Sequence, residues 1–403
     1  MSVLKGTKIA WILIIALAVV LIVMSRFARP FVYVSGDIDI YQSIGEYVWG
    51  STDTLKSEYP SLASALFALL HPPAFGAPFP DAWSAFLVLV CLTATAWAAW
   101  ACSAREGCFF LLSIIATMLL LGLDVTWGRF DVLVGTLLLL TWLAHRRGKF
   151  ATCGFFLIVA AGMKLIPLVL LPFLYAATPK ASLRPLMTGV FAGVLLVAGL
   201  PLLVLGPVGT FENSLYMVLY HAQRGVQLES TWSGLTILWE VLHGRRATML
   251  FAFRSHVNIE VPAVLPLLGM VLGTLGLLGI FWKRRNSGNT ALVFLCILCW
   301  LLFFSPVLSP QYITWFLPLL LAWGALELTG GKTSLSTVLI LCVGCAVALL
   351  TNWFYLPLYL NLVDKQDLLP TLVLNLRNAL LFVFAWLCYR ATKTPSPSGE
   401  GEG

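Results

Sequence analysis

The sequence predicts an all-helical polytopic membrane protein, a bundle with about 11–12 membrane passes. Three observations predict this class. Only 11% of the residues are charged, against about 25% in soluble domains. Hydrophobic residues make up 60% of the chain, the mean hydropathy is +0.91, and apolar runs of about 20 residues recur. Because these runs lack the short alternating pattern of a strand barrel, they are expected to be helices. The net charge of +7 reflects loop asymmetry rather than nucleic-acid binding.

The apolar runs define the expected membrane spans. They fall at about 9–25, 82–102, 109–124, 131–144, 150–176, 185–206, 262–282, 291–305, 312–326, 335–353 and 371–389. The first run follows MSVLKGTK without a small-residue cleavage site, so we expect it to remain as an anchor. Residues 1–392 are expected to form a single membrane domain, and the polar tail 393–403 a disordered cytoplasmic segment.

The short loops separate by charge, and basic short loops stay on the cytoplasmic side. The basic gaps are Lys5/Lys8, Arg105, HRRGK (145–149), PKASLR (179–184), KRRN (283–286), Lys332 and Arg390/Lys393. With both termini inside, all of them are cytoplasmic only if the segment 150–176 enters the membrane and returns. Pro167 interrupts this segment and Lys164 is costly at the bilayer centre, so we predict a broken hairpin with Lys164 near its outer turn. The alternative is one tilted, kinked helix with Lys164 snorkelling.

This topology places the long polar segments outside. The outward segments are 27–81, 124–130, the surroundings of Lys164, 207–261, 306–311 and 354–370. Loop 207–261 carries Arg224, Arg245, Arg246 and Arg254, against the charge rule. Long loops obey that rule weakly, and basic residues there also suit an anionic ligand.

The first outer loop contains the candidate general base. Asp37 and Asp39 open the stretch IDIYQSIGEYVWG, whose apolar spacing suits an amphipathic helix on the membrane surface. A carboxylate at that boundary is suited to take a proton; the alternative is a solvated loop acid. Glu58 and Tyr59 follow, and residues 61–71 form a second apolar piece too short to span comfortably, so it is expected to be interfacial or re-entrant.

Further polar residues are expected on the same side. WGRFD presents Arg129 and Asp131 at the outer start of a span, with an interfacial ion pair as the structural alternative. If residues 221–228 are helical, His221 and Arg224 share a face, which could also belong to an ordinary polar helix. The remaining candidates for positioning donor or acceptor are Gln227, Glu229, Gln311 and Tyr312; aromatic residues here could equally belong to the interfacial belt.

Together these residues suit a lipid-borne anionic substrate and an alcohol that must lose a proton. Arg129, Lys164 and Arg224 would hold a phosphate, while the carboxylate of Asp37 accepts the proton.

Seven motifs carry a family resemblance. They are GDIDIY, EYPSL, WGRFDVLVGTLLLL, GMKLIPLVLLP, RGVQLESTWSG, LSPQYITWFLPLL and LRNALLF, in order along most of the chain. With this set the chain resembles the polyprenyl-phosphate-sugar-dependent glycosyltransferases of the GT-C fold, and most closely glycosyltransferase family 87, with its mannosyltransferases and arabinofuranosyltransferase-like members. EYPSL departs from the EYPPL of many relatives and leaves that turn less constrained.

The resemblance implies a helical bundle in the plasma (inner) membrane with its active site facing the periplasm. It implies a polyprenyl-monophosphate sugar donor, mannose first and arabinofuranose second, and a lipid or glycan acceptor. It also implies a single inverting displacement without metal or other cofactor, and an acidic general base at Asp37, with Asp39 as second choice.

Two other classes compete with the enzyme. A transporter or flippase of lipid-linked sugars would show inverted repeats and broken helices in matched halves, and only one broken hairpin is evident. A non-catalytic scaffold would not need Asp37, Arg129 and Lys164 on one side. The nine cysteines lie in or beside apolar runs, so packing explains them better than metal binding.

Overall fold

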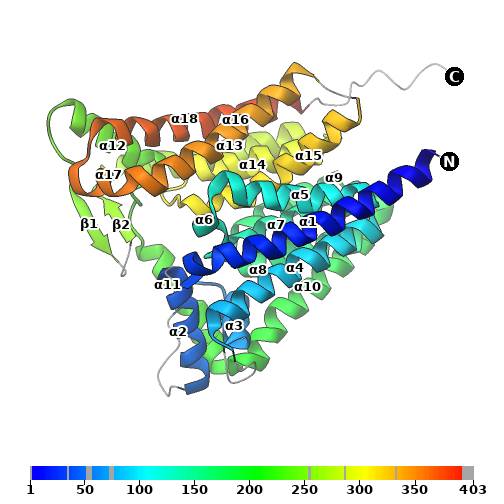
Figure 1. Ribbon diagram of the computed structural model, residues 1–403. Helices are drawn as coiled ribbons and strands as arrows, with labels where there is room; N and C mark the ends of the chain where they lie inside the picture. The colour runs from blue at the N-terminus through cyan, green and yellow to red at the C-terminus, as the bar shows by residue number, and fades with distance from the viewer. Residues whose placement is uncertain are drawn as a thin grey trace. The chain divides into compact units, whose positions relative to one another are not determined.

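The computed structural model describes residues 2–33, 36–50, 57–71, 77–252, 256–285, 287–331 and 334–392 (Figure 1). The described chain is helical apart from one two-stranded antiparallel sheet, in which β1 (Met249–Ala252) pairs with β2 (His256–Ile259). The predicted all-helical class is therefore confirmed. The predicted disordered tail, 393–403, lies outside the described residues.

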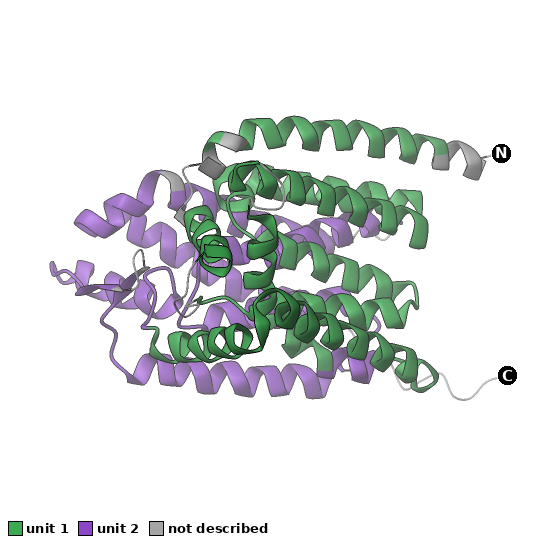
Figure 2. Ribbon diagram, turned by 90° about the horizontal axis from the view of Figure 1, so that it is seen from below, with its two compact units in different colours: residues 1–171, 178–224 green, residues 172–177, 225–403 purple. Residues whose placement is uncertain are grey.

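The chain divides into two compact units (Figure 2). Unit 1 comprises residues 1–171 and 178–224, and unit 2 comprises residues 172–177 and 225–403. The single membrane domain expected over residues 1–392 stays a prediction.

Unit 1 is built from helices throughout its described part. They are α1 (Ser2–Tyr33), α2 (Gly36–Gly50), α3 (Ser61–Leu70), α4 (Phe79–Ala101), α5 (Ala104–Leu121), α6 (Leu123–Trp127), α7 (Asp131–Arg146), α8 (Phe150–Met163), the 3-10 helices η1 (Ile166–Leu170) and η2 (Lys180–Ser182), α10 (Leu183–Val204) and α11 (Gly206–Gln223).

Unit 2 holds the sheet and the remaining helices. They are α9 (Leu171–Ala177), α12 (Thr231–Leu242), α13 (Val264–Arg284), α14 (Thr290–Phe304), the 3-10 helix η3 (Pro310–Trp315), α15 (Leu317–Thr329), α16 (Leu335–Trp353), the π-helix η4 (Phe354–Leu358), α17 (Tyr359–Lys365) and α18 (Leu368–Ala391).

Every predicted span coincides with helix. Among the described residues, eight helical segments are long and apolar enough to cross a membrane: Lys8–Ala28, Phe79–Ala101, Ala104–Leu121, Lys180–Val204, Val264–Arg284, Pro310–Thr329, Leu335–Trp353 and Leu368–Ala391. Phe150–Met163, Ile166–Ala177 and Thr290–Phe304 are apolar but shorter. The protein is an integral membrane protein, while the number of crossings and their direction stay predictions.

The segment 150–176 breaks at Lys164, as expected. Helix α8 ends at Met163, Lys164 is extended (φ −151°, ψ 129°), and Pro167 lies in the following 3-10 turn. Helices α8 and α10 run parallel in close contact: a Cβ atom on Gly189 would lie 1.7 Å from the Ala151 carbonyl oxygen, and one on Gly162 would lie 2.5 Å from Val197. Because α10 begins beside the start of α8, the chain returns by about 21 Å, the length of α8, between Met163 and Leu183. This return agrees with the predicted broken hairpin, while its two membrane passes stay a prediction.

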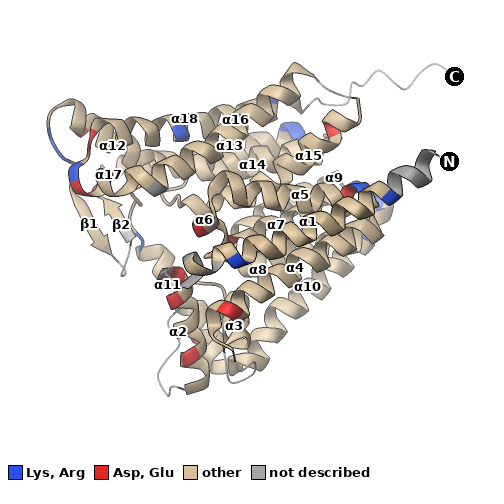
Figure 3. Cartoon of the chain, viewed as in Figure 1, with Lys and Arg blue, Asp and Glu red and all other residues tan. Residues whose placement is uncertain are grey.

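Charged residues of unit 1 lie at the two ends of its helices (Figure 3). Residues 145–149 and 180–184 lie where α8 and α10 begin, whereas residues 129–131 and Lys164 lie at the opposite end. The basic loops of this unit therefore share one end, as the charge rule requires. Which end faces the cytoplasm stays a prediction.

The predicted outer loop 207–261 is largely regular structure, since it contains α11, α12 and the sheet. Its position on the outer side of the membrane stays a prediction. Buried apolar residues from α12, the sheet, η4, α17 and α18 form a core under this region of unit 2, among them Leu228, Ile237, Val257 and Phe354. That burial explains why the segment folds although it falls below the hydropathy of a membrane span.

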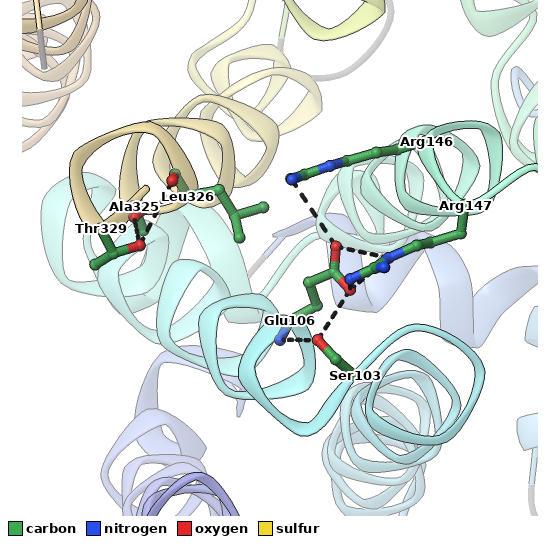
Figure 4. Close-up of polar contacts among 7 residues, drawn as sticks. All are labelled: Ser103, Glu106, Arg146, Arg147, Ala325, Leu326 and Thr329. Atoms are coloured by element: carbon green, nitrogen blue, oxygen red, sulfur yellow. Dashed lines mark hydrogen bonds and ion pairs between the residues drawn. The ribbon is translucent and has the colours of Figure 1, made fainter. Parts of the chain in front are cut away.

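An ion pair between the buried carboxylate of Glu106 and the exposed Arg147 joins α5 to the end of α7 at the basic end of unit 1 (Figure 4). Ser103 caps α5 by accepting from the Glu106 backbone amide at 3.2 Å and donating to its carboxylate at 3.0 Å. The Arg147 Nε donates to both oxygens of that carboxylate, at 2.8 and 3.1 Å, while Arg146 lies 3.9 Å away. Glu106 is only 2% exposed, so these cations compensate an otherwise desolvated charge.

We expect Glu106→Gln to lower the free energy of unfolding by about 1–3 kcal/mol, because it removes charge-assisted hydrogen bonds to a buried carboxylate. Thermal unfolding in detergent measures this. The matched control is Glu240→Gln, which breaks the more exposed pair with Arg245 and should cost about 0–1 kcal/mol. Equal losses for both variants would contradict the role given to Glu106.

Candidate active site

An ion pair joins the first predicted acid to the first predicted cation. Asp37 lies in the first turn of α2, and its Oδ2 is 3.1 Å from Nη1 of Arg129, which precedes α7. Both side chains keep about a fifth of their surface exposed, at 20% and 17%. Asp39, two residues further on, points to another side of α2 and is exposed. The geometry therefore separates the two candidate bases, and Asp37 is the one beside a cation.

A second ion pair lies one residue beyond Phe130. The Nζ atom of Lys164 is 3.6 Å from Oδ1 of Asp131, which is almost fully buried. The same ammonium lies 4.8 Å from the ring centroid of Phe130 and 5.6 Å from that of Tyr59, within cation–π range. The helix break thus presents a charged side chain to a carboxylate and two rings, which removes the need for it to snorkel.

Tyr41 is a site residue that the sequence reasoning missed. It is fully buried, four residues after Asp37 on the same face of α2, and its hydroxyl accepts from the Phe130 amide at 3.4 Å. Its ring stacks on Phe67 at 4.2 Å. Burial, followed by the charges of Asp37 and Asp131, raises the pKa of Tyr41 well above its usual value, so it remains a neutral phenol. The i, i+4 spacing from Asp37 was the available signal.

Glu58, Tyr59 and His221 meet at the end of α11. His221 hydrogen-bonds the backbone of Glu58, and it feels the charges of Arg224 and Lys164 as well as that of Glu58. Tyr59 is buried, which is the main reason that its pKa is raised, and the Glu58 charge adds to this effect. Unit 1 therefore gathers nine of the predicted residues, and eight of them, all except Asp39, interact with one another.

One local expectation was wrong. His221 and Arg224 do not share a helix face, because α11 ends at Gln223 and Arg224 is extended (φ −69°, ψ 125°). The chain beyond it joins the sheet, where Gln227 bridges Asn258 and the Leu228 amide donates to Val257 at 2.9 Å. These backbone bonds outcompete a further helical turn. The Arg224 guanidinium instead covers the ring of Tyr220 at 5.7 Å.

The other four predicted residues belong to unit 2 and are buried. Gln227 donates to the Ser309 hydroxyl at 2.9 Å. Tyr312 stacks on Trp315 at 4.3 Å, and Gln311 lies beside it in η3. Glu229 is 3% exposed and faces Arg377, whose Nη1 is 3.5 Å from its carboxylate. Their roles toward donor and acceptor stay predictions.

Arg377 is the second residue that the sequence reasoning missed. It lies in the middle of α18, is fully buried, and donates to the Glu229 backbone carbonyl at 2.7 Å. The motif LRNALLF contained the signal, because an arginine in an apolar span requires a partner.

The comparison with protein families decides the identity of the chain. The model of glycosyltransferase family 87 matches residues 58–310, more than half of the chain. The chain belongs to glycosyltransferase family 87. No curated protein matches it significantly. The resemblance stated from the seven motifs is therefore confirmed, and the protein is a membrane glycosyltransferase.

The family match covers most of the site described above. Glu58, Arg129, Asp131, Lys164 and His221 fall within the matched residues, whereas Asp37 precedes them. Asp37 is brought to this family region by its ion pair with Arg129 and by the buried face of α2 that carries Tyr41.

We expect this family 87 protein to lose stability as the pH falls below about 6.5, the unfolded pKa of histidine, and to lose activity as the pH falls further, through the lowered folded pKa of His221. The surrounding protein desolvates the partly exposed His221, and Arg224 and Lys164 lower its pKa further. Between the folded pKa and 6.5 the unfolded chain binds more protons, so stability rises with pH and is lost on acidification. Melting temperature and transfer rate against pH measure this. In the variant His221→Gln, melting temperature and transfer rate should fall less on acidification. If they fall as much as in the wild type, His221 is not the group responsible.

Proposed function

We propose that the protein transfers a sugar, mannose first, from a polyprenyl-monophosphate donor to a hydroxyl of a lipid or glycan acceptor at the outer face of the plasma membrane. The observation that carries this proposal is the double ion pair of residues 129–131, Asp37 with Arg129 and Lys164 with Asp131. Family membership supplies the reaction class, glycosyl transfer.

The charges of this site suit a phosphate that arrives with the donor. Arg129 and Lys164 are only about one-sixth exposed, at 17% and 16%, so their attraction for an anion is weakly screened. Each already faces a carboxylate. The side chain of Asp131 is only 1% exposed, whereas that of Asp37 is 20% exposed. The donor phosphate therefore displaces Asp37 from Arg129 more readily than it displaces Asp131 from Lys164.

This exchange prepares the base. Once Arg129 binds the phosphate, the Asp37 carboxylate is free to accept the proton of the acceptor hydroxyl. The acceptor oxygen forms its bond to the anomeric carbon while the bond from that carbon to the phosphate oxygen breaks. The phosphate leaves with the electron pair, and Arg129, Lys164 and Arg224 hold its charge. A single displacement of this kind inverts the anomeric centre. The buried Tyr41 takes no part in the proton transfer, because its raised pKa keeps it neutral.

The test uses purified protein in liposomes with radiolabelled polyprenyl-phosphate mannose or arabinofuranose and a lipid acceptor. We expect labelled glycolipid of inverted configuration, formed equally well with and without a chelator, because no step uses a metal. Label that crosses the bilayer without product would favour a transporter. Product from nucleotide sugars alone would exclude the donor class.

The proposed orientation has a separate test. Single cysteines at the exposed positions Asp39 and Lys149, in a cysteine-free background, are labelled in intact cells with an impermeant maleimide. Residue 39 should react from outside and residue 149 only after lysis. Reaction of both from the same side would contradict the topology, with both termini cytoplasmic, and the periplasmic site.

A further inference from the structure

The segment that carries Glu58 lies antiparallel along α11, within unit 1. Glu58 contacts His221 near the end of that helix, and Ser61 contacts Ser214 and Thr210 nearer its start. We propose that Asn213 is a positioning residue for sugar transfer, which holds Glu58 and His221 in register at the site. This inference rests on the proposed function.

Asn213 is fully buried and uses both ends of its amide. Its Nδ2 donates to the Tyr59 carbonyl at 3.1 Å and to the Ser61 hydroxyl at 3.1 Å. Its Oδ1 accepts from the Ser64 hydroxyl at 3.3 Å. An amide supplies two donors and an acceptor on one rigid plane, and no other side chain of this size does so. The network therefore specifies one alignment of residues 59–64 on α11.

Neighbouring hydroxyls complete the alignment. The Ser57 hydroxyl lies 3.0 Å from that of Ser64 and accepts from the Tyr59 amide at 3.2 Å, and both serines are buried. Ser61 also pairs with Ser214 at 2.9 Å. Ser61 is the position at which EYPSL departs from the EYPPL pattern, so in this chain hydrogen bonds to α11 supply the constraint that a proline would give to the turn.

The position of Asn213 explains why its effect should reach the chemistry. It fixes the carbonyl of Tyr59, the residue that follows Glu58, so a slip of this contact moves Glu58 directly. The same shift would weaken the hydrogen bond between the Glu58 backbone and His221. It would also move the Tyr59 ring, whose centroid lies 5.6 Å from Nζ of Lys164. Asn213 itself is enclosed by protein, so it acts through these groups without touching substrate.

A double-mutant cycle in the liposome assay tests the proposal. We expect Asn213→Ala to lower kcat about 10–100-fold by misplacing the site residues, with the donor KM within about threefold of wild type. Because part of the effect of Asn213 passes through the contact of Glu58 with His221, Asn213→Ala combined with His221→Gln should lower kcat by clearly less than the product of the two single losses. Ser61→Ala is the matched control, since it removes the contacts of Ser61 with Asn213, Ser214 and Thr210 but keeps the Asn213 bond to Tyr59; its kcat should stay within about threefold.

The outcomes separate the inference from the proposed function. If wild type transfers sugar but Asn213→Ala keeps its kcat, or if the two losses in kcat multiply independently, Asn213 is not a positioning residue. If wild type transfers no sugar from any polyprenyl-phosphate donor, the proposed function fails first. Should Asn213→Ala not purify as a folded protein, Asn213→Asp keeps the side-chain volume, removes both donated bonds and is judged by the same criteria.

Discussion

Replacement of Asp37 by asparagine is expected to lower the rate of sugar transfer by about 10²–10⁴-fold, the usual contribution of a general base. Asparagine has the same shape and still accepts a hydrogen bond from Arg129, so the pair 3.1 Å apart in the wild type is replaced without a cavity. It cannot take a proton from the acceptor. The initial rate with saturating donor and acceptor measures the loss, and an unchanged melting temperature shows that the fold is intact.

The control for this prediction is Asp39→Asn. Asp39 carries the same charge on the same helix but is exposed and points away from Arg129, so its transfer rate should stay within about twofold. If Asp39→Asn abolishes transfer and Asp37→Asn does not, the base is misassigned although the enzyme class survives. If neither changes the rate, the proposed base is not on α2.

The second large effect concerns the stability of unit 2. We expect Arg377→Met to destabilise the protein by about 3–5 kcal/mol, because it leaves the buried carboxylate of Glu229 without its cation. Arg377 is fully buried and donates both to that carboxylate and to the Glu229 carbonyl. Thermal or denaturant unfolding in detergent measures the loss, together with the yield of folded protein.

The double variant Arg377→Met, Glu229→Gln shows whether charge is the cause. It removes the stranded carboxylate, so it should recover about half or more of the lost stability. If the double variant is as unstable as Arg377→Met alone, lost packing rather than the uncompensated charge explains the effect.

Much of the fold could be predicted because its signals are local. Hydropathy over about 20 residues located the spans, and the helix break at Lys164 follows from the backbone restriction of Pro167 in the segment itself. The site was partly predictable for a similar reason. Asp37, Arg129 and Lys164 are conspicuous because ionisable groups are scarce in a chain with 11% charged residues.

Other features had no such signal. The end of α11 at Gln223 depends on backbone bonds that residues 227 and 228 make with residues 257 and 258, about 30 positions away. In the sequence Asn213 is an ordinary polar residue. Its proposed positioning role depends on its hydrogen bond to the carbonyl of Tyr59, 154 positions away. Arg377 was visible as a charge in a span, but its partner was not.

The sequence by itself determined that this protein is a helical membrane protein, because burial in lipid selects composition and length along the chain, and its seven motifs carried the resemblance to glycosyltransferase family 87. The tertiary structure alone decided the partners: Asp37 with Arg129, Lys164 with Asp131, and Glu229 with Arg377. The physical reason is that desolvated charges and amides take whichever partner packing brings within about 3–4 Å, and that choice depends on residues remote in sequence.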